Sequence, residues 1–271
     1  LIPGFTKVVH NVYTPEGAES FYVDLQAVQK GPVVILLSRL PIKCPPAPYE
    51  MAMLIRDYLN GAGKSNIPVQ IYSPEPHPLP VAGPEIGKMV EKIVTEKGIQ
   101  IFLNHTVKEI QSGERRIVFE NGKTASYELL GGVPPHIAPA ILKKSGLLGD
   151  SGWVAIDRET CQTKIDRVYA IGDVVAIPIG DGKALPKAGL FAELEGEVVA
   201  RRIAAEIQGK IPSATFTAQG TCFMETGIKT AAKITADFFV SPLNIVVTPP
   251  SEEGRREKDE FEKTRIERWF K

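Results

Sequence analysis

The segment Gly31-Pro32-Val33-Val34-Ile35-Leu36-Leu37 decides the fold that we expect for this sequence. A Gly-Pro pair interrupts the chain, and an unbroken run of β-branched and aliphatic residues follows it. Such a run is typical of a parallel strand that is buried on both faces of its sheet. We therefore expect Val33–Leu37 to be a buried strand of a parallel sheet.

Helical and strand patterns alternate around this run. Helices are predicted from Pro15 to Gln29, near Met51–Leu59 and from Pro84 to Gly98, and further strands are predicted at Val69–Ser73 and Ile99–Leu103. A β-α-β-α-β order of this kind indicates an α/β fold with a parallel, doubly wound, Rossmann-like sheet.

The remaining patterns add an antiparallel ribbon and a small α+β C-terminal region. The ribbon is predicted from three short strands with a hairpin turn at Asn121-Gly122: Thr106–Gln111, Arg115–Glu120 and Thr124–Glu128. The other predicted elements are a strand at Val168–Ile171, a long helix at Ala188–Gln208, strands at Thr215–Glu225 and Lys229–Phe239, and a charged helix at Glu252–Phe270.

Composition excludes several classes of function. The chain has 271 residues, and its 32 basic and 32 acidic residues leave no positive field for holding nucleic acid. No apolar run approaches the ~20 residues that cross a bilayer. The four histidines are scattered and no Cys-x-x-Cys pair exists, so we expect no metal site. Gly63-Lys64-Ser65 is not a phosphate loop, because Tyr58 stands where that motif needs glycine.

A strand-like stretch from Thr163 ends in Gly172-Asp173 and precedes a Pro- and Gly-containing loop and the long helix. Gly-Asp after a strand is often only a turn. The full T-x6-A-x-G-D pattern, however, resembles the second FAD motif of the pyridine-nucleotide-disulfide reductase superfamily. The resemblance implies that Asp173 binds the ribityl chain of FAD and that Gly172 lets the backbone approach it.

The segment Ala184-Leu-Pro186-Lys187-Ala188-Gly189 opens the long helix. Free backbone N–H groups and the dipole make a helix start a site for negative charge. The superfamily resemblance places Lys187, Ala188 and Gly189 under the pyrimidine end of the flavin. The alternative is that Lys187 is an ordinary exposed lysine.

The segment Lys43-Cys44-Pro45-Pro46-Ala47-Pro48-Tyr49-Glu50 stands where a nicotinamide-binding domain would have G-x-G-x-x-G. Prolines remove N–H donors, so we expect no dinucleotide site there. Cys44 is beside Lys43 and just before a predicted helix, and both features lower the pKa of a thiol. We therefore expect Cys44 to be a reactive thiolate.

The Cys-Pro-Pro-Ala-Pro-Tyr-Glu segment resembles the redox-cysteine segment of sulfide:quinone oxidoreductases and of the flavoprotein subunit of flavocytochrome c sulfide dehydrogenase. In that group a second cysteine near the C-terminus pairs with the first, and Cys222 falls where it should. The resemblance implies that Cys44 and Cys222 form a redox disulfide or a sulfur-bridged version of it. It makes Glu50 an acid or base, although a first-turn glutamate also suits the helix dipole. Cys161 matches no motif cysteine and is expected to be structural.

The resemblance also predicts a division of the chain into four parts. These are a connector from the FAD domain (1–30), a second Rossmann-like domain (31–130), the C-terminal part of the FAD domain (131–211) and an α+β domain (212–271). The first FAD-binding βαβ unit of the family, with its G-x-G-x-x-G, is absent from these residues. We therefore expect a natural start upstream of Leu1, weak or no FAD binding by this chain alone, and a sheet edge through which it could form a homo-oligomer.

The function expected from the resemblance is sulfide oxidation with electrons passed through FAD to a quinone or cytochrome c. Quinone is preferred because Phe261, Ile266, Trp269 and Phe270 make the charged terminal helix amphipathic, which suits contact with a membrane surface. The alternative is that this helix packs on its own domain. The expected location is the cytoplasm or a membrane surface, with the periplasm left open. Two other functions stay open: a type II NADH dehydrogenase-like flavoprotein, and an inactive fragment or binding module without flavin.

Overall fold

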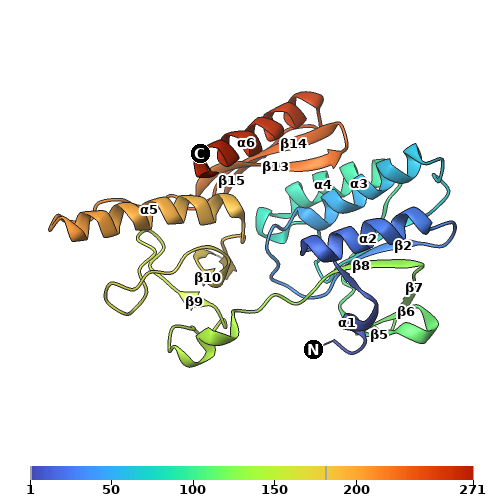
Figure 1. The fold of residues 1–271 in the computed structure, drawn as a ribbon, viewed down its shortest axis with the longest axis horizontal. Helices are drawn as coiled ribbons and strands as arrows, with labels where there is room; N and C mark the ends of the chain where they lie inside the picture. Colours follow the sequence, from blue (N-terminus) through green and yellow to red (C-terminus); the bar gives the residue numbers. More distant parts are fainter. Residues whose placement is uncertain (1, 181, 271) are drawn as a thin grey trace.

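The computed structural model describes residues 2–180 and 182–270. A five-stranded parallel sheet has the strand order β1-β8-β2-β3-β4 (Figure 1). The bounds of its strands are His10–Asn11 for β1, Leu129–Val133 for β8, Val33–Leu37 for β2, Val69–Tyr72 for β3 and Gln100–Phe102 for β4. The predicted run at Val33–Leu37 is confirmed, and all five of its residues are buried.

Successive residues of β2 point to opposite faces of the sheet, and the two faces have different covers. Val33, Ile35 and Leu37 pack with the helices α2 (Pro15–Ala27), α3 (Ala47–Gly61) and α4 (Pro84–Glu96). Val34 and Leu36 pack with the antiparallel ribbon of β5 (Val107–Gln111), β6 (Arg116–Phe119) and β7 (Thr124–Ser126). The three helices lie on one face and the ribbon on the other (Figure 1), which confirms the expected Rossmann-like parallel sheet with an antiparallel ribbon on it.

The predicted strand at Val168–Ile171 is wrong. Arg167 turns the chain with a φ of 57°, and the segment folds back on residues 161–163. There it makes one isolated bridge between Gln162 and Tyr169. Among the described residues no further strand lies beside it, so the backbone ladder that would make it a strand does not form.

The elements after β8 are short until the long helix α5 (Gly189–Ile207). Two of them are short helical turns, η3 (Ala140–Lys144) and η4 (Gly172–Val174). The others are short strands: β9 (Val154–Ala155), β10 (Val175–Ala176), β11 (Pro178–Gly180) and β12 (Lys183–Ala184). Their apolar side chains form a core with α5 around Val154, Val175 and Phe191. Cys161 is fully buried in this core, as the structural interpretation predicted.

The C-terminal region is an antiparallel sheet of β13 (Gln219–Gly227), β14 (Thr230–Asp237) and β15 (Asn244–Val247), with α6 (Glu252–Phe270) packed on it. Met224 and Ile234 belong to the core beneath α3, whereas Ala236 and Phe238 belong to the core beneath α5. This sheet therefore joins the two halves of the molecule (Figure 1).

Candidate active site

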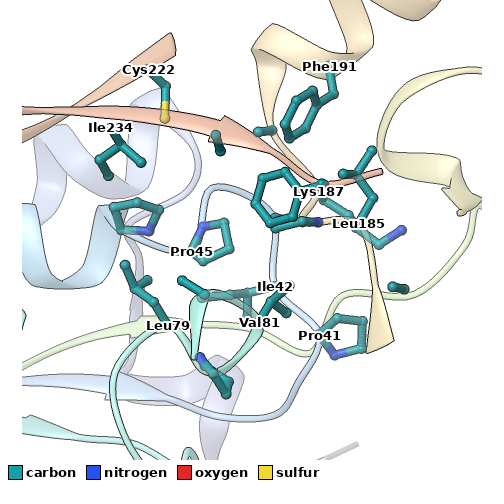
Figure 2. A pocket seen from close by; sticks show the side chains of 18 of the residues that line it. Pro41, Ile42, Pro45, Leu79, Val81, Leu185, Lys187, Phe191, Cys222 and Ile234 are labelled. Atoms are coloured by element: carbon teal, nitrogen blue, oxygen red, sulfur yellow. The ribbon is translucent and has the colours of Figure 1, made fainter. Parts of the chain in front are cut away.

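A cavity of about 250 Å³ lies where the two cores meet. Its walls come from the loops after β2 and β3, from the segment before α5, and from β13 and β14. The lining is almost wholly apolar and includes Pro41, Ile42, Pro45, Leu79, Val81, Leu185, Phe191 and Ile234 (Figure 2). The exceptions include Glu75, Lys187 and Cys222. An apolar cavity with a few converging polar groups is the usual form of a small-ligand site.

Cys44 is held at the edge of this cavity by its backbone. Its N–H donates to the Lys187 carbonyl over 2.6 Å, and its own carbonyl accepts from the Tyr13 hydroxyl over 3.2 Å. Its φ of 47° lies in the left-handed region, which is uncommon for residues other than glycine and is concentrated at functional sites. The chain before α3 is thereby fixed against the segment before α5.

Cys222 reaches the same cavity from β13, and Figure 2 shows its thiol pointing inward, toward the side on which Pro45 lies. Glu50, in the first turn of α3, accepts a hydrogen bond of 2.6 Å from the Glu225 backbone N–H. Glu50 acts electrostatically on both thiols, and Cys222 acts on Cys44. The fold therefore brings together the three residues that the resemblance marked as catalytic.

The expectation of a low thiol pKa at Cys44 is wrong. The Cys44 side chain has an exposed face, yet burial by the groups around it, the Glu50 carboxylate and Cys222 raise its pKa to about 12. Burial and Glu50 raise the pKa of Cys222 to about 11. Removal from water and a nearby negative charge both disfavour a thiolate, and together they outweigh Lys43 and the helix start.

Glu50 exchanges its proton close to neutral pH. Burial raises its pKa to about 7; the Glu225 N–H lowers it, the Glu225 carboxylate raises it, and Lys258 lowers it. A group with such a pKa is suited to general acid or base work, because both of its forms are populated near pH 7. Its position beside two thiols gives it a proton to accept.

The residues of the predicted flavin motif lie together in a turn that contacts the Lys187 side chain. Gly172 has a φ of 73° and Asp173 is exposed, both in the turn η4. The Lys187 ammonium donates to the carbonyls of Asp173 and Val175, over 2.7 Å each, and lies 3.7 Å from the centre of the Trp153 ring. Burial lowers the pKa of Lys187 to about 8.

The start of α5 is open beside this turn. Ala188, the N-cap, makes no side-chain cap, and a Cβ built on Gly189 would meet no atom within 4 Å. An exposed carboxylate, an uncapped helix start and a lysine next to a cavity make a set of acceptors and donors that fits the sugar chain and polar ring edge of a flavin.

Two buried glutamates near the site were not predicted from the sequence. Glu195 of α5 is 2% exposed, accepts a 2.5 Å hydrogen bond from the Gly172 N–H, and has a pKa that burial raises to about 7. Glu75 is 1% exposed and accepts from the hydroxyls of Tyr49 and Ser73. Glu195 has the sequence appearance of any helical surface glutamate, whereas the setting of Glu75 between two prolines after a strand was a usable signal.

His136 and the terminal helix are placed as follows. The Nδ1 atom of His136 accepts from the Lys43 backbone N–H over 2.9 Å, so the histidine lies beside the Cys44 loop. In α6, Phe261 packs against Phe223 with ring centres 5.6 Å apart, so its side chain is turned to the sheet. Trp269 and Phe270 are 54% and 79% exposed. No helix within residues 2–180 and 182–270 has the length and apolar character to cross a membrane.

Comparison with known proteins shows what the chain is similar to. The chain is 24% identical over 246 residues to the mitochondrial sulfide:quinone oxidoreductase of Mus musculus, covering 88% of this chain and 53% of that protein. It is 26% identical to the one of Schizosaccharomyces pombe, covering 82% and 48%. The chain thus spans about half the length of the curated relatives it matches.

The solved sulfide:quinone oxidoreductase of Aquifex aeolicus superposes with a TM-score of 0.83 at 22% identity, covering 97% of this chain and 64% of that one. This likeness confirms the fold expected from the sequence. The family described as pyridine nucleotide-disulphide oxidoreductase matches residues 49–205. This match covers more than half of the 271 residues, and the chain therefore belongs to the pyridine nucleotide-disulphide oxidoreductase family.

Proposed function

We propose that this chain carries the sulfide site of an FAD-dependent sulfide oxidoreductase. The observation that carries the proposal is that Cys44, Cys222 and Glu50, from segments far apart in sequence, act electrostatically on one another beside an apolar cavity that Cys222 and the neighbour of Cys44, Pro45, line. The relatives are named sulfide:quinone oxidoreductases, and the solved one from Aquifex aeolicus shares the fold.

The proposed reaction begins on a sulfur bridge between Cys44 and Cys222. Hydrosulfide attacks one sulfur of the bridge, a new S–S bond forms, and the old S–S bond breaks. One cysteine then holds a persulfide and the other leaves as a thiolate. Since both thiols have raised pKa values, Glu50 is placed to exchange the proton that the released sulfur or the incoming sulfide carries.

FAD, when bound, supplies the acceptor for the two electrons that the sulfide sulfur loses. The residues proposed to hold it are Gly172 and Asp173 at the ribityl chain and Lys187, Ala188 and Gly189 at the ring edge. Lys187 is fixed by two backbone carbonyls, so its charge is already positioned. The apolar lining of the cavity leaves few polar partners for water beside the Cys222 sulfur.

Substitution of each cysteine tests the proposal in the flavin-loaded protein. Cys44→Ser and Cys222→Ser should each abolish sulfide-dependent reduction of a soluble quinone, and Cys161→Ser, the matched control in the α5 core, should retain it. If either of the first two variants keeps the activity of the unsubstituted protein, the mechanism is wrong. The absorbance spectrum of the purified 271-residue chain shows whether it binds flavin without further residues.

A quinone acceptor at a membrane surface is the preferred final step. The support is the exposed end of α6, where Ile266, Trp269 and Phe270 present apolar surface among charges. In liposome flotation, the unsubstituted protein should therefore float with the vesicles, and the Trp269→Ser/Phe270→Ser variant should be absent from the vesicle fraction.

Self-association of the chain through an open sheet edge is also part of the proposal, and analytical sedimentation measures it.

A further inference from the structure

Glu225 connects the cysteine site to the terminal helix. Its backbone N–H donates to Glu50 over 2.6 Å, while its carboxylate accepts from Arg255 over 2.7 Å and from Lys258 over 2.9 Å. Arg255 and Lys258 belong to α6, and the register of β13 shifts between Glu225 and Gly227. One residue of β13 thus binds Glu50 on one side and two cations of α6 on the other.

This ion cluster is partly shielded from water. The exposed fractions of the side chains are 17% for Glu225, 25% for Lys258 and 30% for Arg255. Charges in such a position are screened by salt less than exposed pairs are. Contacts at the other end hold α6 in place: Arg265 pairs with Glu193 of α5 over 2.7 Å. The cations therefore have a fixed position relative to the site.

The charged and titratable groups that act on Glu50, or on which it acts, come from every neighbouring element. They are Tyr13 after β1, Cys44 before α3, Cys222 and Glu225 of β13, and Lys258 of α6. Lys258 is the cation of this set. Glu225 is the anion whose charge raises the pKa of Glu50. Tyr13 and the two thiols have raised pKa values and are uncharged near neutral pH.

We propose that Glu225 and Lys258 are positioning residues through which α6 sets the proton affinity of Glu50 and, through Glu50, the ionisation of the cysteine pair. The inference rests on the proposed function, in which Glu50 exchanges protons with the thiols. Lys258 favours the carboxylate of Glu50, and Glu225 opposes it, so the two residues act in opposite directions.

The opposite signs make the inference testable. Lys258→Gln removes the cation and should raise the pKa of Glu50, whereas Glu225→Gln removes the anion, keeps the backbone N–H bond, and should lower it. Each shift should be about 0.3–0.7 pH units, the size typical of charge pairs near a surface. A purely structural role would weaken packing in both variants and would give no such opposition.

The experiment is a pH titration of the Glu50 carboxyl carbon by NMR in glutamate-labelled protein, with the signal assigned by its loss in Glu50→Gln. Lys263→Gln, a loss of the same charge at an exposed site of the same helix, should leave the titration unchanged, and Lys258→Arg should restore it. Opposite shifts in the two test variants support the inference. No shift, shifts of one sign, or an equal shift in Lys263→Gln would overturn it.

Failure of this inference is separable from failure of the proposed function. The titration needs neither sulfide nor turnover, so it reports on the α6 cluster even if the cysteines have no part in sulfide oxidation. Conversely, loss of activity in Cys44→Ser with an unresponsive Glu50 would keep the proposed function and remove the role of α6.

Discussion

Replacing the buried Glu195 by glutamine should stabilise the protein at alkaline pH. The carboxyl group is 2% exposed, and burial raises its pKa from 4.5 to about 7, despite the Gly172 N–H and Lys187, which favour the charged form. The shift is about 2.5 units (7 − 4.5), and one unit corresponds to ~1.4 kcal/mol, so the ionised form costs about 3 kcal/mol relative to water. Glutamine keeps an oxygen for the Gly172 N–H and carries no charge.

The sign follows from the raised pKa. The folded state holds the proton more tightly, so the contribution of Glu195 to stability is full below about pH 4.5 and is lost as pH rises through about 7. The gain of Glu195→Gln over the unsubstituted protein should therefore be up to about 3 kcal/mol larger at pH 8 than at pH 4.5. The cost of burying the glutamine amide is the same at both pH values, so it cancels when the stability gains at pH 8 and pH 4.5 are subtracted.

Urea unfolding at pH 4.5 and pH 8 measures this difference. Glu197→Gln, two residues along the same helix and more exposed, is the matched control and should show no comparable gain at pH 8. A gain of Glu195→Gln that is the same at both pH values would refute the reasoning, because it would show that the folded and unfolded states hold the Glu195 proton equally, so that burial does not raise its pKa.

Three further predictions concern the thiols and the packing. Because their pKa values are about 12 and 11, Cys44 and Cys222 should be alkylated by iodoacetamide at rates that rise about tenfold per pH unit up to pH 10; a plateau below pH 9, measured by mass spectrometry, would contradict this. Gly132→Ala places a Cβ 2.5 Å from a valine side-chain atom and should lower the free energy of unfolding by ~1–3 kcal/mol in urea, whereas an unchanged midpoint would show that β8 is less tightly packed. Tyr49→Phe removes a hydroxyl that donates to the buried Glu75 and should cost ~1–3 kcal/mol at pH 8, and no loss would mean that water replaces this donor.

The parallel sheet was only partly readable from the sequence. Val33–Leu37 was predicted residue for residue, because burial on both faces demands an apolar side chain at each position. The neighbouring strand β8 was missed, because glycine is depleted in strands and this one contains Gly131 and Gly132. The structure requires these glycines: a Cβ on Gly131 would lie 2.9 Å from Phe21.

The site was predictable in its residues but not in its electrostatics. Cys44 and Cys222 are 178 positions apart (222 − 44), and their pairing came from a family resemblance, since no local pattern links them. The pKa of Cys44 was predicted in the wrong direction because Lys43 is adjacent in sequence, whereas the burial and the Glu50 charge that dominate arise from the fold. The division into domains stays a prediction.

The central claim, that Cys44 and Cys222 share one redox site, is tested most directly by mapping the bridge that the protein forms. After mild oxidation with diamide, proteolysis without reduction and mass spectrometry should yield a peptide that links Cys44 to Cys222, with or without an added sulfur, while Cys161 stays free. A linkage through Cys161, or two thiols at positions 44 and 222 that never join, would contradict the account.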